Sequence, residues 1–148
     1  MHRNALYADI ERVPEILTAI VKRAGEDTSM ATNNAREIVD RYFAAMAEKD
    51  FATIRTLVHD DVTFKGAMGT TNGAEEYIGG LQQTLANMRE VRRHVIAVEG
   101  ENVFQVYDLI MGELDVSLPV AQWLLVRDGR IAALQVFFDP RPLMGPAK

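Results

Sequence analysis

The sequence predicts an α+β fold in which two helices come before the strands of one antiparallel sheet. Amphipathic helical segments fill residues 37–49 and 50–58, and a third helical segment follows over 74–88. Turn signals at Gly100-Glu101 and Asp128-Gly129 separate four apolar runs of strand length. Consecutive hairpins form one sheet, and the helices are then left to cover one of its faces.

Apolar side chains recur at helical spacing on the first two helices, which gives each helix one face for a core. They are Ile38, Tyr42, Phe43 and Met46 on the first helix and Phe51, Ile54, Leu57 and Val58 on the second. Tyr42 carries the single hydroxyl on its face. We expect the two helices to meet at Lys49-Asp50, where Asp50 can cap the free N–H groups of the second helix.

The remaining elements follow from turn residues and apolar runs. A polar turn at Asp60-Asp61 is expected to lead into a strand over 62–65, and the sequence GAMGTTNG that follows is interpreted as a glycine-rich loop. The third helix contains Gly79-Gly80, and each glycine costs about 1 kcal/mol relative to alanine. Such a pair indicates either close approach of a backbone or ligand, or simple tolerance. The later strands are predicted over 91–99, 102–111, 118–127 and 130–139.

Residues 1–28 are expected to form an extra helix in front of a domain that spans 29–148. The apolar residues of this segment have helical spacing, Pro14 suits a first helical turn, and Gly25 suits a C-terminal cap. An isolated helix of this length is marginal in water, so we expect it to pack on the domain or on a partner subunit.

Composition limits the classes of function. The chain has 148 residues, of which 48% are hydrophobic and 25% charged, as expected for one globular domain. A net charge of −5 argues against nucleic-acid binding, because phosphate contact needs clustered positive charge. The chain has no cysteine, and its three histidines lack metal-ligand spacing, so we expect neither metal nor cofactor. No apolar run suits a signal peptide or a bilayer, which predicts a cytoplasmic protein without membrane contact.

Three stretches, EIVDRYFAAM, HDDVTFKG and VAQWLLVRDGRIAALQVFFDPRP, closely resemble the nuclear transport factor 2-like superfamily. This superfamily includes ketosteroid isomerases, limonene epoxide hydrolases and SnoaL-like polyketide cyclases. The resemblance covers about residues 34–142 and is to the SnoaL-like, ketosteroid isomerase-like type. It implies a curved sheet, antiparallel or mixed, that three helices wrap into a cone around a cavity. Because such folds host many chemistries, activity must be argued from the residues of the site.

The resemblance to ketosteroid isomerases assigns three positions. Their oxyanion-binding tyrosine matches Tyr42, their general base falls at Gly66, and the aspartate of their oxyanion hole falls near Gln122. Glycine cannot accept a proton, so standard ketosteroid isomerase chemistry is not expected. A glutamine can donate one hydrogen bond and accept another, which suits a carbonyl or hydroxyl ligand.

The orientation of Gln122 depends on the turn that follows it. A three-residue loop with a left-handed Gly129 would place Gln122 opposite Leu134 and facing the cavity. A two-residue loop would place Trp123 there instead. We favour the three-residue loop, which leaves Trp123 on the outer face.

The resemblance to limonene epoxide hydrolases concerns an aspartate–arginine–aspartate set. Asp108 matches the first aspartate, but the arginine becomes Val106 and the second aspartate becomes Val136, so that mechanism is not expected. Asp108 still lies in an apolar strand, where it is either a proton carrier or the partner of Arg93 across the hairpin. If the hairpin register slips by one residue, His94 would face Asp108 and form an acid–base pair.

These inferences define the candidate site. The catalytic candidates are Asp108, Tyr42 and His94, and the ligand-binding candidates are Gln122, Phe64, Met68, Leu134, Val136 and Phe138. A mostly apolar lining with few polar groups is typical of a pocket for a small molecule, here a planar or alicyclic one that bears oxygen.

Two classes of function remain open from the sequence. As an enzyme, the protein would catalyse isomerisation, aldol-type cyclisation or dehydration, with Asp108 moving a proton while Tyr42 and Gln122 polarise a carbonyl. Alternatively, the domain binds a ligand without chemistry or serves as a dimeric assembly module. Trp123 and Phe137 on the outer face of the sheet favour a symmetric homodimer.

Overall fold

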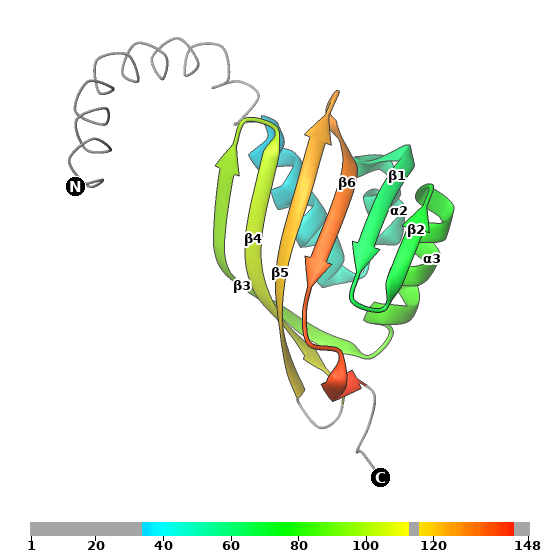
Figure 1. The fold of residues 1–148 in the computed structure, drawn as a ribbon, viewed down its shortest axis with the longest axis vertical. Coiled ribbons are helices and arrows are strands. Elements are labelled where there is room, and N and C mark those ends of the chain that lie inside the picture. Colours follow the sequence, from blue (N-terminus) through cyan, green and yellow to red (C-terminus); the bar gives the residue numbers. More distant parts are fainter. Residues whose placement is uncertain (1–33, 113–115, 144–148) are drawn as a thin grey trace, which may run out of the picture.

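A computed structural model of the chain describes residues 34–112 and 116–143. The predicted helix within residues 1–28 lies outside these described residues. The described residues form a six-stranded sheet in the order β2-β1-β6-β5-β4-β3 (Figure 1). All neighbouring strands are antiparallel except β1 and β6, which run parallel, so the sheet is mixed. The strands are β1 (Val58–Gly66), β2 (Gly69–Asn72), β3 (Met88–Glu99), β4 (Asn102–Met111), β5 (Val116–Arg127) and β6 (Arg130–Phe137).

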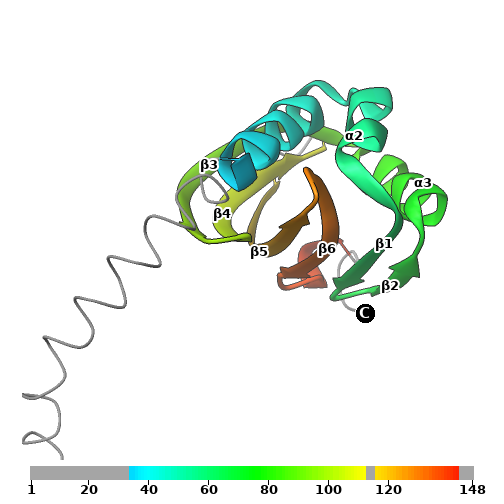
Figure 2. The same cartoon turned by 90° about the horizontal axis from the view of Figure 1, so that it is seen from above.

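The helices of the described region all lie on one side of this sheet. They are a helix over residues 34–48, called the long helix below, α2 (Phe51–Leu57) and α3 (Ala74–Leu85). Seen from above, the sheet curls around them and leaves its convex face uncovered by described elements (Figure 2). A short 3-10 helix, η1 (Arg141–Leu143), closes the lower end of the sheet. The predicted α+β cone, with a curved sheet wrapped by three helices, is confirmed.

The junction of the first two helices follows the sequence prediction. The long helix ends at Lys49, whose φ of +56° is left-handed, and Asp50 caps α2. The Asp50 Oδ1 atom accepts from the Thr53 backbone N–H at 3.1 Å, and Oδ2 accepts from the Thr53 hydroxyl at 2.6 Å. These bonds fix the angle at which the apolar faces of the two helices meet the sheet.

The region between α2 and α3 corrects two predictions. β1 begins directly after α2, so Asp60-Asp61 lies inside a strand and not in a turn. The register of β1 against β6 shifts between Val58 and Thr63, and this irregularity accommodates the two exposed carboxylates. The segment interpreted as a loop contains β2, which pairs with β1 from Thr63 to Gly66. A four-residue strand is short, and pairing with β1 stabilises it more than its own residue preferences do.

The turn between β5 and β6 also differs from the prediction. Asp128 and Gly129 have φ values of +53° and +76°, and Arg127 pairs with Arg130 across them. Positive φ at both central residues defines a two-residue type I′ turn. The favoured three-residue loop was therefore wrong.

A bulge next to this turn nevertheless puts Gln122 on the predicted face. The pairing of β5 with β6 shifts by one residue between Leu125 and Val126, which leaves Ala132 of β6 without a partner opposite it. The shift restores the side-chain phase that the longer loop would have given. As a result, Gln122 is buried on the concave face, and Trp123 points toward the convex face.

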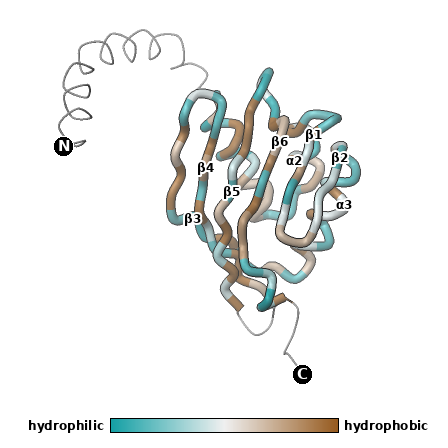
Figure 3. Tube along the Cα trace, in the orientation of Figure 1, coloured by the Kyte–Doolittle hydropathy of each residue, from teal (hydrophilic) through white to brown (hydrophobic). Residues whose placement is uncertain are grey.

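The core lies between the helices and the concave face of the sheet. Hydropathy mapped on the chain shows apolar segments along β5 and β6, whereas the ends of the β3–β4 and β5–β6 hairpins are hydrophilic (Figure 3). The long helix contributes Val39, Tyr42 and Met46, all of which are fully or almost fully buried. β5 contributes alternate residues, Leu118, Val120, Leu124 and Val126.

Two neighbouring leucines of β5 can test which face of the sheet each side chain of this strand occupies. Leu124 is fully buried on the concave face, whereas Leu125 is only partly buried on the other. We expect Leu124→Ala to lower the free energy of unfolding by about 2–5 kcal/mol, because it leaves a cavity in the core. The matched control Leu125→Ala should cost less than half as much, as measured by urea denaturation. Equal losses for the two variants would contradict the register of β5.

Candidate functional site

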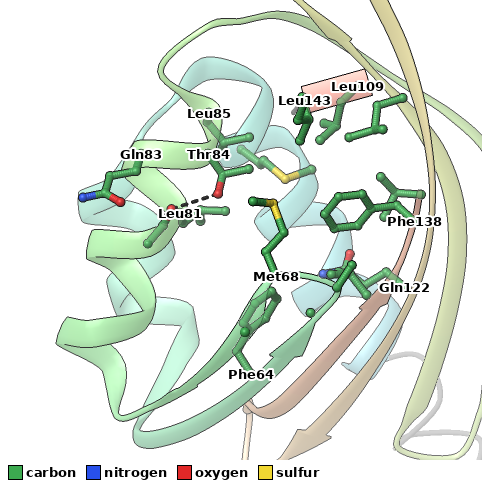
Figure 4. A pocket seen from close by; sticks show the side chains of 18 of the residues that line it. Phe64, Met68, Leu81, Gln83, Thr84, Leu85, Leu109, Gln122, Phe138 and Leu143 are labelled. Carbon is green, nitrogen blue, oxygen red and sulfur yellow. Dashed lines mark hydrogen bonds between the residues drawn. The ribbon is translucent and has the colours of Figure 1, made fainter. Parts of the chain in front are cut away.

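A cavity of about 550 Å³ lies between the concave face of the sheet, α3 and η1 (Figure 4). Most of its walls are apolar. They include Met46, Phe64, Met68, Leu81, Leu85, Leu109, Met111, Leu118, Val120, Val136, Phe138 and Leu143. None of the described lining residues carries a carboxylate, an imidazole or a basic group.

The opening of the cavity is formed by the β1–β2 hairpin and by α3. Met68, at the tip of the hairpin, is 68% exposed and extends toward Phe138 and Gln122 on the opposite wall (Figure 4). On α3, the Thr84 hydroxyl donates to the Gly80 carbonyl at 3.0 Å, so this polar group is used within its own helix. Thr70, Thr71, Gln83 and Asn87 also line the cavity, so its walls carry further polar groups on this side.

Tyrosine hydroxyls make up much of the polar part of the cavity. Tyr42 from the long helix and Tyr77 from α3 are both buried, and their hydroxyl oxygens lie 2.6 Å apart. Tyr107 from β4 also lines the cavity. Its ring meets Phe43 edge-on, with ring centroids 5.7 Å apart. Three helical or strand elements thus bring their phenol groups into one buried cluster.

The surroundings of these tyrosines keep them protonated. Burial raises the pKa of Tyr42, although hydrogen bonds from Tyr77 and Gln122 act in the opposite direction. Burial raises the pKa of Tyr77 and of Tyr107 well above the usual value, and proximity to Tyr42 adds to both shifts. All three groups are therefore neutral near pH 7 and act as hydrogen-bond donors or acceptors rather than as bases.

A buried polar chain connects this cluster to the surface. Gln105 Nε2 donates to Gln122 Oε1 at 2.8 Å, and Arg93 Nε donates to Gln105 Oε1 at 3.2 Å. Arg93 Nη1 in turn donates to Asp40 Oδ1 on the long helix at 2.7 Å. The Arg93 guanidinium also stacks over the Phe43 ring, 4.5 Å from its centroid. Since both glutamines are at most 3% exposed, the chain satisfies groups that water cannot reach.

The structure places most of the predicted binding residues at the cavity. Tyr42, Phe64, Met68, Gln122, Val136 and Phe138 all line it. Leu134 does not, because β5 pairs Gln122 with Val136 and Leu124 with Leu134, one step deeper in the core. Whether the lining residues bind a ligand stays a prediction.

The two titratable candidates lie on the other face of the sheet. His94 Nε2 and Asp108 Oδ2 are 2.7 Å apart, so the pair that a register shift would form is present. A bulge between Arg93 and Val95 supplies this shift. However, His94 is 53% exposed, and neither residue lines the cavity. The expectation that Asp108 projects into the cavity beside Tyr42 was wrong, and so was its alternative pairing with Arg93, which turns inward.

Alternation along β4 explains this correction. Val106 and Asp108 share the convex face, so their neighbours Gln105 and Tyr107 point inward. Sequence reasoning missed both residues as members of the site. The sequence did contain a signal for them. Gln105 and Tyr107 both end in a polar group, and residues two apart in a strand lie on the same face. Tyr77, which also lines the cavity, was not predicted as a site residue either.

The structure also shows the surroundings of the glycines considered in the sequence, Gly66 and the pair Gly79-Gly80. A Cβ atom on Gly66 would lie 2.9 Å from the Phe64 ring, so that ring occupies the space where the side chain of a base would begin. A Cβ on Gly79 or Gly80 would meet no atom within 4 Å. No described backbone approaches this pair, and Gly80 borders the cavity.

Comparisons with known proteins agree with this architecture. A family model described as the SnoaL-like domain matches residues 39–134. No curated protein matches the chain. In the described residues, no group of three or more His, Cys, Asp or Glu side chains could hold a metal ion. No described helix combines the length and apolarity needed to cross a membrane.

Solved structures share the fold over about three quarters of the chain. A nuclear transport factor 2-like protein of unknown function from Cytophaga hutchinsonii has 27% identity and a TM-score of 0.66, covering 75% of this chain and 95% of its own. An LEH-like epoxide hydrolase from M. tuberculosis has 26% identity and a TM-score of 0.65, covering 76% and 88%. A hypothetical protein with a ketosteroid isomerase-like fold from Catenulispora acidiphila, solved with trimethylamine, has 25% identity and a TM-score of 0.60, covering 70% and 85%.

Buried tyrosines make the stability of the fold sensitive to alkali. Because the pKa of Tyr42, Tyr77 and Tyr107 is raised in the folded protein, the unfolded chain ionises first as the pH rises through about 10. The folded chain then binds more protons, so the free energy of unfolding should fall by up to about 1.4 kcal/mol per pH unit for each tyrosine. Below this range the contribution is fully present. Urea denaturation between about pH 9 and about pH 11 measures the slope. Tyr77→Phe should flatten it, and an unchanged slope would contradict the assignment.

Proposed function

This chain belongs to the SnoaL-like domain family, and we propose that its cavity binds a small, mostly apolar molecule through an oxygen atom that accepts a hydrogen bond. The observation that carries the proposal is the contrast inside the cavity. Its walls are mostly apolar, and a hydrogen-bonded pair of phenols, Tyr42 and Tyr77, lies beside Gln122 in the lining. A volume of about 550 Å³ suits a ligand of one or two fused rings.

The chemistry of the polar cluster supports an oxygen acceptor. The Tyr42 hydroxyl is neutral, because burial raises its pKa although two hydrogen bonds act in the opposite direction. It can therefore donate a hydrogen bond to an oxygen acceptor. One of the similar structures contains trimethylamine, but none of the described lining residues carries a carboxylate that would pair with an ammonium ligand.

Binding without proton abstraction fits the described residues best. Isomerisation, cyclisation and dehydration need a proton acceptor beside the ligand. Asp108 and His94, the two candidates for this role, lie on the convex face. Gly66 carries no side chain, and the tyrosines are protonated. We therefore favour a ligand-binding protein whose cavity holds and polarises its ligand.

A homodimer through the convex face is a second proposal. Large apolar side chains are exposed there: Val95, Phe104, Val106 and Phe137 are between 38% and 56% exposed. Val95 pairs with Val106, and the row continues across the sheet through Ala121 to Phe137. A continuous apolar row on an uncovered sheet is the kind of surface that a twofold partner covers.

The Tyr42 hydroxyl can be tested with a matched pair of probes. 2-Tetralone and tetralin have the same fused rings, and only the ketone offers an oxygen acceptor. We expect Tyr42→Phe to weaken 2-tetralone binding by about 1 kcal/mol, or about fivefold, because one hydrogen bond is lost. Tetralin affinity should not change, as measured by isothermal titration calorimetry. Wild-type protein that binds both probes equally would contradict the proposed function.

The dimer can be tested by placing a charge on the convex face. Phe137 is 56% exposed, and Phe137→Glu should shift the protein from dimer to monomer in sedimentation velocity. Met68→Glu serves as the control, because Met68 is a large exposed apolar residue away from that face. A wild-type chain that is monomeric at high concentration would exclude the interface.

A further inference from the structure

We infer that Arg93 and Gln105 are positioning residues that fix the direction of the Gln122 amide, so that the cavity selects ligands with an oxygen acceptor over ligands with a cationic N–H donor. This inference rests on the proposed function and adds to it a ligand class and the residues that determine it. It is carried by the direction of the hydrogen bonds from Asp40 to Tyr42.

The direction of this chain is set at the Arg93 end. A guanidinium can only donate hydrogen bonds, so whichever amide atom of Gln105 faces Arg93 must be the oxygen. Arg93 cannot turn away, because Asp40 binds its Nη1 and the Phe43 ring packs on its guanidinium. The Gln105 oxygen is therefore committed to Arg93, and its amide nitrogen is left to face Gln122.

The same reasoning applies to the hydrogen bond between Gln105 and Gln122. Gln105 Nε2 can only donate, so the atom of Gln122 at 2.8 Å must be Oε1. The Gln122 amide nitrogen is then directed away from Gln105, toward Tyr42 and the cavity. An isolated glutamine can present either end of its amide, whereas this one presents its N–H groups only.

The N–H donor of Gln122 determines whether the Tyr42 hydroxyl can donate its proton to a ligand. The Gln122 N–H groups are directed away from Gln105, and the Tyr42 hydroxyl beside them shares a hydrogen bond with Tyr77 at 2.6 Å. The paired phenols therefore retain a hydroxyl proton for the ligand, and no amide carbonyl competes for it. An oxygen acceptor gains a hydrogen bond at this end of the cavity, whereas an ammonium group would face N–H donors.

The substitution Gln105→Glu reverses the direction of the chain at constant size. A carboxylate still accepts from Arg93, which neutralises its charge, but it cannot donate to Gln122. Gln122 must then turn its N–H groups toward position 105 and its carbonyl toward Tyr42. The Tyr42 hydroxyl would donate to this carbonyl and would no longer be available to a ligand. Gln135→Glu is the matched control, because it adds the same charge to β6 outside this chain.

Calorimetry with 2-tetralone, tetralin and 2-aminotetralin tests the inference. Wild-type protein and Gln135→Glu should prefer the ketone to tetralin by about fivefold and bind the ammonium most weakly. Gln105→Glu should lose the preference for the ketone and bind the ammonium about fivefold more tightly. A folded Gln105→Glu variant that keeps the wild-type ratio would overturn the inference but leave the proposed function intact. If wild-type protein does not prefer the ketone, the proposed function itself fails.

A measurement on the wild-type protein covers the case in which the variant does not fold. In proton NMR, the Gln122 side-chain amide protons should show nuclear Overhauser contacts to the Tyr42 ring. The Gln105 amide protons should show contacts to the Gln122 side chain and none to Arg93 Hε. Gln105 amide protons in contact with Arg93 Hε would mean the opposite amide direction and would overturn the inference.

Discussion

The rest of the structure depends on one constraint, namely which face of the sheet each strand side chain occupies. Two bulges set it, one between Arg93 and Val95 and one at Ala132. The first turns Arg93 toward the helices and leaves His94 on the convex face, and the second brings Gln122 inside. Because strand side chains alternate between faces, loss of either bulge would move every residue beyond it to the opposite face. The composition of the cavity is thus decided by two single-residue irregularities.

A second constraint follows from burying polar groups on the concave face. An unpaired buried polar group costs about 1–3 kcal/mol, so Gln105 and Gln122 are tolerated only because they are paired with each other and with Arg93. The pairing extends through Tyr42 to Tyr77 and ends at the cavity. The atoms that satisfy one another in the core are therefore the same atoms that the proposed function assigns to ligand recognition.

Much of the fold could be predicted from the sequence, because helical spacing around Tyr42 and the turn residues at Gly129 are strong local signals. The layer order, the junction at Asp50 and the span of β4 are as predicted. β2 was missed because its stability comes from pairing with β1, which no local pattern records. Asp108 was placed inside on the resemblance to limonene epoxide hydrolases, whereas the alternation of β4 puts it on the convex face with Val106. Gln122 faces inward for a reason other than the one proposed, namely the bulge at Ala132.

Met68 gives the cavity an adjustable boundary. Its unbranched thioether side chain has several rotatable bonds and is 68% exposed at the opening, where it can repack around guests of different outline at low energetic cost. On α3, Gly80 also borders the cavity and adds no side chain to its wall. The buried end of the cavity is by contrast held rigid by its hydrogen bonds. For the ligand-binding role proposed above, we therefore expect loose discrimination by shape and strict discrimination by polarity.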